Sequence, residues 1–362
     1  MTEVVAQIEG RIGTITLNRP KALNALSLGM VRALTQALQD WQSHPQVLAV
    51  AVRGTGKEGP FGAFCAGGDI RFFHQAAHAG DASLGDFFTE EYRLNHLIHT
   101  YPKPYIAFMD GIVMGGGMGI SQGASVRVVT ERTKMAMPET KIGLFPDVAG
   151  TYFLARATGA MGLYLGLTSN VINGADAVAA KLADTYMTVD GQQAFLQQLD
   201  EFSWSAAPLN DVVRLVTANA TTPPASTLAS LSDAMEKHFA GKQGVQDIIA
   251  SLLGETEPSA SDWAHKTAAD LSKRSPTLME VTKRQIENGH KLSVADCLRL
   301  ELGMMYRAFE HPDVVEGIRA LAIDKDNQPR WSPATLAEVS SDVVESFFAP
   351  RWTAAEHPLA KL

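Results

Sequence analysis

Two carboxylates in an apolar stretch of the chain are the first candidates for chemistry. Glu139 and Asp147 belong to residues 137–147, Met-Pro-Glu-Thr-Lys-Ile-Gly-Leu-Phe-Pro-Asp, called the acidic segment below. A carboxylate among apolar neighbours loses hydration, so its pKa rises and it can serve as a general acid, a base or a nucleophile. The alternative is structural, with Glu139 capping a turn and Asp147 capping the next helix. The segment alone does not separate these interpretations.

Two glycine-rich segments follow predicted strands. The first glycine segment, residues 64–70, reads Phe-Cys-Ala-Gly-Gly-Asp-Ile, and the second, residues 110–119, reads Asp-Gly-Ile-Val-Met-Gly-Gly-Gly-Met-Gly. Small residues let the backbone approach a ligand closely. Unpaired N–H groups at a helix start stabilise negative charge that develops on an oxygen. Backbone amides near Gly68 and Gly116 are therefore candidates for polarising a substrate carbonyl.

Each glycine segment also has a less specific interpretation. The first can be a flexible turn capped by Asp69, because these residue types are common in turns. The second can be a dinucleotide-binding loop, but its glycines lack the third member of that fingerprint at the required spacing.

The elements that must position these segments alternate between strand and helix, which favours parallel pairing of the strands. The pattern predicts an opening hairpin over residues 4–17 and a helix capped by Ser27. It then predicts strands at 47–52, 105–109 and 126–129, with helices at 86–100, 149–164 and 174–181. A further helix is predicted to begin at the second glycine segment and to end near Gly123. Beyond residue 200 the pattern is helical, and residues 220–226, with two prolines, are expected to form a loop or linker. We therefore expect two domains, residues 1–200 and residues 201–362.

Composition restricts the class of protein. The 362 residues carry a net charge of −8, and 46% are hydrophobic, which is typical of a folded chain with a substantial core. The acidic balance argues against nucleic acid as a partner. Two cysteines do not form a secreted disulfide scaffold, no signal peptide is recognisable, and no apolar run is long enough for a membrane helix. We expect a cytoplasmic protein that does not bind membranes.

Histidine pairs with helical spacing are the only pattern that suggests a metal. His74 and His78 are four residues apart and His96 and His99 three apart, but no acidic or cysteine partner completes a ligand set with either pair. We expect no metal site.

Taken together, the segments resemble a known family. Residues 19–26, Arg-Pro-Lys-Ala-Leu-Asn-Ala-Leu, with the two glycine segments, resemble the crotonase superfamily, which contains the enoyl-CoA hydratases and isomerases. Several segments are similar to its 3-hydroxyisobutyryl-CoA hydrolases, namely the acidic segment, residues 150–154 and the C-terminal stretches 275–277, 316–320, 323–326 and 329–331. The resemblance implies an α/β fold, namely a crotonase-like ββα spiral core with a mostly helical C-terminal region.

The resemblance also implies roles for individual residues. The amides of Gly68 and Gly116 would form an oxyanion hole for a thioester carbonyl. Glu139 would activate water or attack the carbonyl, and Asp147 would hold the water or a substrate hydroxyl. The residues that would contact the substrate and its CoA group are Glu91, Lys21, Ala22, Leu23, Ala66, Asp69 and Ile70. No cofactor is implied, because CoA is part of the substrate.

One departure from the superfamily pattern selects between reactions. Hydratases of the superfamily carry a second glutamate three residues after the middle glycine of the second segment, where this chain has Gly119. The resemblance therefore implies hydrolysis of an acyl-CoA thioester, with 3-hydroxyisobutyryl-CoA as the leading substrate and a place in valine breakdown. The alternatives are an enoyl-CoA hydratase or isomerase and a non-catalytic acyl-CoA-binding protein. A homo-oligomer is possible.

Overall fold

The structure, a computed structural model, describes residues 2–57, 59 and 61–362 and divides into two compact units. Unit 1 contains Met1–Gly68, Arg93–Ala136 and Val171–Thr227, and unit 2 contains Asp69–Tyr92, Met137–Asn170 and Leu228–Leu362. Each unit therefore gathers segments that are distant in sequence. The expected domains, residues 1–200 and residues 201–362, are continuous segments of the sequence, whereas these units are defined by packing. The division into those two domains stays a prediction.

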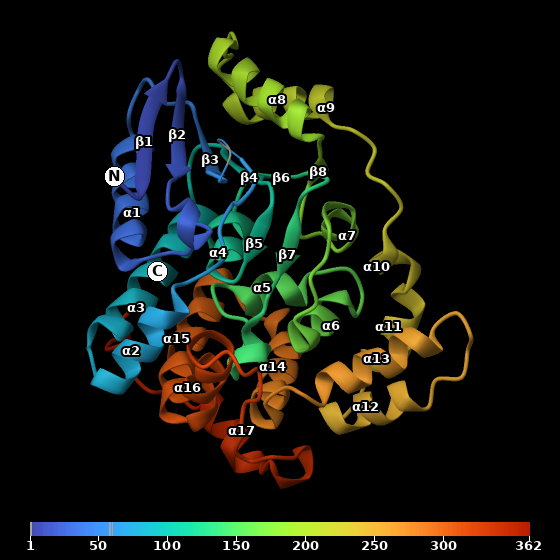
Figure 1. Cartoon of the computed structure of the whole chain (residues 1–362). Coiled ribbons are helices and arrows are strands. Elements are labelled where there is room, and N and C mark those ends of the chain that lie inside the picture. The colour runs from blue at the N-terminus through green and yellow to red at the C-terminus, as the bar shows by residue number, and fades with distance from the viewer. Residues whose placement is uncertain (1, 58, 60) are drawn as a thin grey trace. The chain divides into compact units, whose positions relative to one another are not determined.

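Unit 1 is built on a six-stranded sheet in the order β1-β2-β3-β4-β6-β8 (Figure 1). Only the opening pair is antiparallel, as the predicted hairpin requires, and the other neighbours are parallel. A two-stranded parallel sheet, β5-β7, accompanies it. The strands are β1 (Val4–Glu9), β2 (Ile12–Leu17), β3 (Ala49–Gly54), β4 (Tyr105–Met109), β5 (Ile112–Met114), β6 (Val126–Val129), β7 (Lys134–Ala136) and β8 (Thr185–Tyr186).

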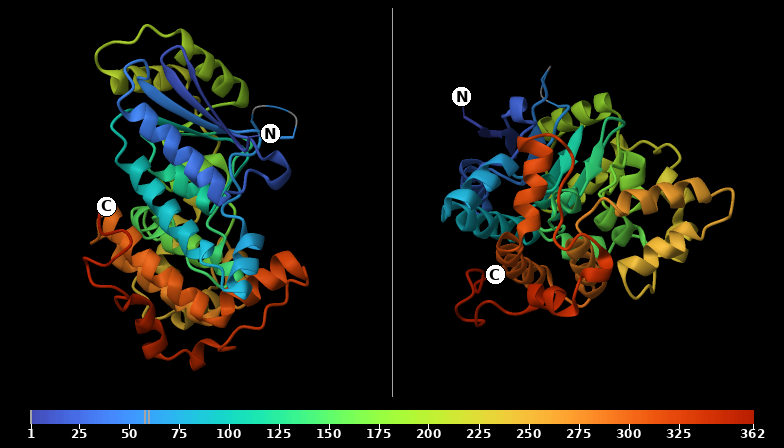
Figure 2. Two further views of the ribbon diagram at one scale, coloured as in Figure 1. Left: turned by 90° about the vertical axis from the view of Figure 1, so that its left-hand side faces the viewer. Right: turned by 60° about the horizontal axis from the view of Figure 1, so that its bottom comes forward.

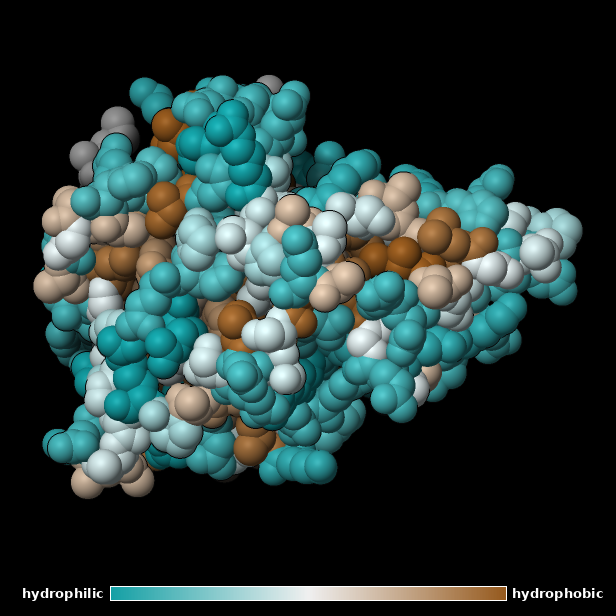
Figure 3. Space-filling model, turned by 90° about the horizontal axis from the view of Figure 1, so that it is seen from below, coloured by the Kyte–Doolittle hydropathy of each residue, from teal (hydrophilic) through white to brown (hydrophobic). Residues whose placement is uncertain are grey.

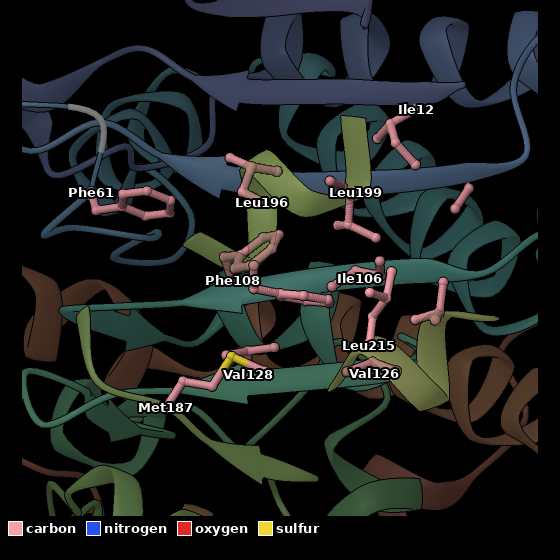
Figure 4. Close-up of a cluster of buried hydrophobic side chains, with 14 residues drawn as sticks. Ile12, Phe61, Ile106, Phe108, Val126, Val128, Met187, Leu196, Leu199 and Leu215 are labelled. Atoms are coloured by element: carbon pink, nitrogen blue, oxygen red, sulfur yellow. The ribbon is translucent and has the colours of Figure 1, made fainter. Parts of the chain in front are cut away.

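Helices cover both faces of the large sheet. On one face, side chains of α8 and α9 pack against strand side chains such as Ile106, Phe108 and Val128 in a buried hydrophobic cluster (Figure 4). On the other face lies α1, where a Cβ added at Gly13 of β2 would come within 2.4 Å of the Trp41 ring (Figure 2). The unit 1 helices are η1 (Pro20–Ala22), α1 (Leu28–Gln42), α4 (Gly116–Gln122), α7 (Gly174–Ala179), α8 (Val189–Glu201) and α9 (Pro208–Asn219).

Unit 2 is made of helices. Two helices, α3 (Ser83–His99) and α10 (Thr227–Ser230), contribute residues to both units. The others are α2 (Ile70–Ala79), η2 (Glu139–Ile142), α5 (Gly150–Ala155), α6 (Met161–Thr168), α11 (Ser232–Phe239), α12 (Val245–Leu253), α13 (Ser261–Leu271), α14 (Pro276–Gly289), α15 (Val294–Glu310), α16 (Pro312–Ile318), η3 (Arg319–Ile323), η4 (Leu336–Glu338) and α17 (Ser341–Phe348).

The surface drawn in Figure 3 is mostly hydrophilic, with hydrophobic residues in separate small groups. Among the described residues, no helix has the length and apolar composition needed to cross a membrane. The expected homo-oligomer stays a prediction.

Most of the expected elements form, and the differences have local causes. Ser27 caps α1 by accepting a hydrogen bond from the Met30 amide at 3.2 Å. The single helix expected over 149–164 is two helices, because Arg156 ends α5 and Met161 begins α6. Helix α8 begins at Val189, before the expected start of the helical region. The short strands β5, β7 and β8 were not expected, since two or three residues carry no periodic pattern.

Candidate active site

Unit 2 gathers four buried carboxyl groups, called the carboxylate cluster. They are Glu91 on α3, Glu139 at the start of η2, Asp147 in the turn before α5, and Glu301 on α15, with exposed fractions of 2%, 5%, 6% and 0%. Burying an ionised carboxylate costs several kcal/mol unless it is paired, so a folded chain rarely brings together several of them. The sequence singled out three members of this cluster and missed Glu301.

The cluster holds protons more tightly than isolated carboxyl groups. Burial raises the pKa of Glu139 well above its ordinary value, and the negative charge of Asp147 raises it further. Burial, with a smaller contribution from Asp147, likewise raises the pKa of Glu91. Burial also raises the pKa of Asp147 to about 6, although hydrogen bonds from Tyr92 and from its own backbone N–H oppose the shift. The cluster can therefore exchange protons close to neutral pH.

Tyr92 gives Asp147 a fixed orientation. The buried Tyr92 hydroxyl donates a hydrogen bond of 2.7 Å to Asp147 Oδ2. The structural alternative for Asp147 is not realised, because the N-cap residue of α5 is Ala149 and not Asp147. Sequence reasoning missed Tyr92, although it directly follows Glu91 in the chain.

Two cluster oxygens are positioned to receive hydrogen bonds. Within the part of the chain that the structure describes, Glu91 Oε1 and Glu139 Oε2 are buried and have no hydrogen-bond partner. A buried acceptor without a partner is costly, so natural proteins retain it where a substrate or a functional proton uses it. In the described ranges, no group of three or more His, Cys, Asp or Glu side chains is arranged to hold a metal ion.

In unit 1 the two glycine segments lie against each other. Cys65 forms a bridge with Val113 of β5, and the Met114 amide donates to the Cys65 carbonyl at 2.9 Å. A Cβ added at Gly117 would come within 2.4 Å of the Cys65 carbonyl oxygen. At Gly67, whose φ is +101°, an added Cβ would lie 3.5 Å from the Gly116 nitrogen. Glycine is therefore required for the close approach of the two backbones.

Gly116 opens α4, so its N–H is among the first-turn donors that have no partner within a helix. The chain reverses sharply before it, at Gly115, with φ of 49° and ψ of −118°. The sequence prediction of a helix start at this glycine run is confirmed.

The predicted CoA-contacting residues fall into both units. In unit 1, the loop after η1 pairs with the first glycine segment: the Ala66 amide donates to the Leu23 carbonyl at 3.0 Å, and Leu26 forms a bridge with Gly68. Leu23 therefore lies beside Ala66, and Lys21 and Ala22 belong to η1, which directly precedes Leu23. In unit 2, Asp69 caps α2 by accepting from the Phe72 amide at 3.4 Å, and Ile70 is the first residue of that helix.

Comparison with known proteins shows which family this chain resembles. The family model described as enoyl-CoA hydratase/isomerase matches residues 12–348. The chain is 39% identical to the mitochondrial 3-hydroxyisobutyryl-CoA hydrolase of Danio rerio over 96% of this chain and 90% of that protein. A solved carnitinyl-CoA dehydratase from Mycobacterium thermoresistibile has a TM-score of 0.87 at 41% identity, covering 96% of both chains. An enoyl-CoA hydratase from Rhodobacter sphaeroides has a TM-score of 0.86 at 35% identity, covering 97% of this chain and 98% of that one.

These comparisons confirm two expectations and correct a third. The predicted resemblance to the 3-hydroxyisobutyryl-CoA hydrolases of the crotonase superfamily is confirmed. The predicted crotonase-like α/β fold with a helical C-terminal region is also confirmed. The expected cytoplasmic location is wrong, because the curated relatives are named as mitochondrial proteins. That expectation depended on finding no leader in the first residues, and a sequence pattern at one end of a chain does not determine its compartment.

Proposed function

Because the chain belongs to the enoyl-CoA hydratase/isomerase family, we propose that it hydrolyses an acyl-CoA thioester. The proposed reaction converts 3-hydroxyisobutyryl-CoA and water to 3-hydroxyisobutyrate and CoA, which is a step of valine breakdown. The observation that carries the proposal is the buried pair Glu139 and Asp147 in the carboxylate cluster, in a chain that has Gly119 where hydratases place their second glutamate.

The proposal divides the chemistry between backbone amides and carboxylates. The Gly68 and Gly116 amides donate to the thioester oxygen as the carbonyl carbon becomes tetrahedral, and one such donor typically contributes about 2.7–4 kcal/mol. Glu139 supplies the base or nucleophile, and Asp147 holds the water or the substrate hydroxyl. When the tetrahedral intermediate collapses, the carbon–sulfur bond breaks and the sulfur leaves with a proton as free CoA. The Glu91 carboxyl group accepts a hydrogen bond from the substrate.

CoA recognition is assigned to the loop after η1, the first glycine segment and the start of α2. Lys21, Ala22, Leu23 and Ala66 would line the CoA groove through backbone contacts, together with Asp69 and Ile70. Their support is the backbone pairing of the loop after η1 with the first glycine segment.

Two routes fit Glu139, and isotope labelling separates them. As a general base, Glu139 removes a proton from water, which attacks the thioester carbonyl directly. As a nucleophile, it forms an anhydride that water then cleaves. A single turnover in ¹⁸O-water, followed by mass spectrometry of the peptide that contains Glu139, gives label in Glu139 only if water cleaves the anhydride at the glutamyl carbonyl. Label confined to the product acid contradicts that nucleophilic route.

The function is tested by following CoA release with a thiol reagent. We expect 3-hydroxyisobutyryl-CoA to release free CoA and crotonyl-CoA to keep its enoyl absorbance. Loss of enoyl absorbance without CoA release would instead identify a hydratase, the activity for which the Rhodobacter sphaeroides structure is named. Tight binding of both thioesters without turnover would identify a non-catalytic acyl-CoA-binding protein.

A glycine substitution tests the role of the amides. In Gly117→Ala, the new Cβ would lie 2.4 Å from the Cys65 carbonyl oxygen, so one glycine segment must move away from the other. We expect kcat to fall about 10²–10³-fold, the typical effect of losing one oxyanion donor. The matched control is Gly29→Ala, also at the second position of a unit 1 helix but with only a 3.7 Å contact. Equal kcat values in Gly117→Ala and wild type would contradict the role of the amides.

The pH dependence of kcat/KM is expected to report the protonation of Asp147, which accepts a hydrogen bond from Tyr92. Because the pKa of Asp147 is about 6, we expect kcat/KM to fall as the pH drops through about 6 and the cluster takes up a proton. Tyr92→Phe removes a hydrogen bond that favours the charged carboxylate, so the acid limb should move to higher pH. Tyr105→Phe, which removes a buried hydroxyl bonded to the Ile120 carbonyl in unit 1, should leave the limb in place. An unmoved limb in Tyr92→Phe would exclude Asp147 as its origin.

A further inference from the structure

Glu301 is the cluster member that neither the sequence analysis nor the proposed mechanism uses. It is fully buried on α15, among apolar neighbours that include Leu298, Leu302 and Met305. Both carboxylate oxygens accept backbone hydrogen bonds from the turn that follows Asp147. The Ala149 amide donates to Oε2 at 2.8 Å, and the Thr151 amide donates to Oε1 at 2.9 Å.

The turn that Glu301 holds has a strained backbone. Val148 and Ala149 both have positive φ, at 53° and 69°. This region is unfavourable for residues with a Cβ and most unfavourable for β-branched valine, at a cost of about 1–3 kcal/mol each. Such a conformation persists only when the surrounding structure enforces it. The turn therefore depends on its hydrogen-bond partners.

A second side chain supports the same turn from α14. Gln285 Nε2 donates to the Pro146 carbonyl and to the Thr151 hydroxyl, both at 2.6 Å. Glu301 and Gln285 thus hold the backbone on both sides of Asp147, from residue 146 to residue 151. Asp147 itself makes its side-chain hydrogen bond to Tyr92.

Stability alone does not account for a carboxylate at position 301. Burial, together with the charge of Asp147, raises the pKa of Glu301 to about 8 in spite of the hydrogen bonds from Thr151 and Ala149, which lower it. A serine or asparagine at the N-cap would satisfy first-turn amides without a buried acid. The chain instead keeps an energetically costly group that fixes the one turn carrying Asp147.

We propose that Glu301 is a positioning residue for hydrolysis: through the Ala149 and Thr151 amides it holds the strained turn 147–149 in the conformation that aims Asp147. This inference rests on the proposed function, because it assigns Asp147 a part in the reaction. Glu301 acts through the backbone and does not contact the substrate.

The test is Glu301→Gln, in which the amide group accepts one N–H but turns its own NH₂ toward the other. We expect kcat for CoA release to fall about 10–100-fold, the usual effect of losing a group that orients a functional side chain. KM should stay within threefold of wild type. Amide hydrogen exchange should accelerate at Ala149 and Thr151 and stay unchanged along α14 and α15.

The matched control is Glu255→Gln. Glu255 is another buried glutamate of unit 2 that accepts two backbone N–H groups, from Thr256 at 2.9 Å and Glu257 at 3.0 Å, but it follows α12. Glu255→Gln should lose stability and keep kcat. If both variants lose kcat in proportion to their stability, the role of Glu301 is only structural and the proposal is overturned.

Further variants cover the remaining outcomes. If Glu301→Gln does not fold, Glu301→Asp, which keeps the carboxyl group but draws it back from the two amides, should lower kcat at unchanged KM. Adding Ala149→Gly to the Glu301 variant that folds should restore part of its lost kcat, since glycine adopts the positive φ without strain. A Glu301 variant whose turn amides exchange freely but whose kcat equals that of wild type would overturn the positioning role of Glu301 and leave the proposed function standing. A wild-type protein that releases no CoA would overturn the proposed function instead.

Discussion

Glu139→Gln is expected to lower kcat for CoA release by about 10³–10⁴-fold. Glutamine has the size and hydrogen-bonding reach of glutamate, but it can neither accept the proton of water nor attack a carbonyl, and general base catalysis typically contributes 10²–10⁴-fold. The measurement is CoA release from 3-hydroxyisobutyryl-CoA under saturating substrate. Retention of more than a tenth of the wild-type kcat would exclude Glu139 as the base or nucleophile.

The same variant is expected to gain stability, which separates lost chemistry from lost folding. Burial raises the pKa of Glu139, so the folded chain binds its proton more tightly than the unfolded chain does. The stability from this group is therefore fully present at low pH and is lost as the pH rises above about 4.5, its ordinary value. Urea unfolding should show Glu139→Gln more stable than wild type at pH 8, with a smaller difference near pH 4. A variant that is inactive and also less stable at pH 8 would contradict this account.

Asp147→Asn is expected to lower kcat by about 10²–10³-fold. Asparagine fills the same volume and keeps an acceptor for the Tyr92 hydroxyl, but it removes the charge that orients a water or a substrate hydroxyl. The acid limb of kcat/KM near pH 6 should also move or disappear, because the group assigned to it no longer titrates.

A substrate comparison shows what Asp147 holds. If it binds the 3-hydroxyl, Asp147→Asn should impair 3-hydroxyisobutyryl-CoA much more than isobutyryl-CoA, which lacks that hydroxyl. If it orients water, both substrates should slow equally. Wild-type kcat with both substrates would remove Asp147 from the mechanism.

The parts of the fold that are readable from the sequence are those with local signals. Ser27 marks the start of α1, and the buried strand β4 was located to the residue because five consecutive apolar residues end at Asp110. The glycine run ending at Gly119 located α4. The parallel sheet follows from the alternation of strands and helices, which leaves few other arrangements.

The candidate site was only partly predictable, because much of it depends on distant contacts. Glu139 and Asp147 were recognisable within one segment, whereas Glu301 meets the Ala149 amide across 152 positions of sequence. A signal for it exists: Glu301 lies in an apolar stripe, with Leu298 three residues before it and Met305 four after it. A charged residue in such a stripe is an exception to the helical pattern, and such exceptions often mark functional positions. Tyr92 had no comparable signal, since tyrosine is ordinary in a buried helix face.

The identity of the products tests the central claim most directly, because hydrolysis and dehydration start from the same molecule. The protein is incubated with 3-hydroxyisobutyryl-CoA in ¹⁸O-water, and all products are identified by mass spectrometry. We predict equal amounts of free CoA and 3-hydroxyisobutyrate, with ¹⁸O in the new carboxyl group. An intact CoA thioester that has lost water and gained a carbon–carbon double bond would contradict the claim, since the carboxylate cluster would then act on the hydroxyl group and not on the thioester.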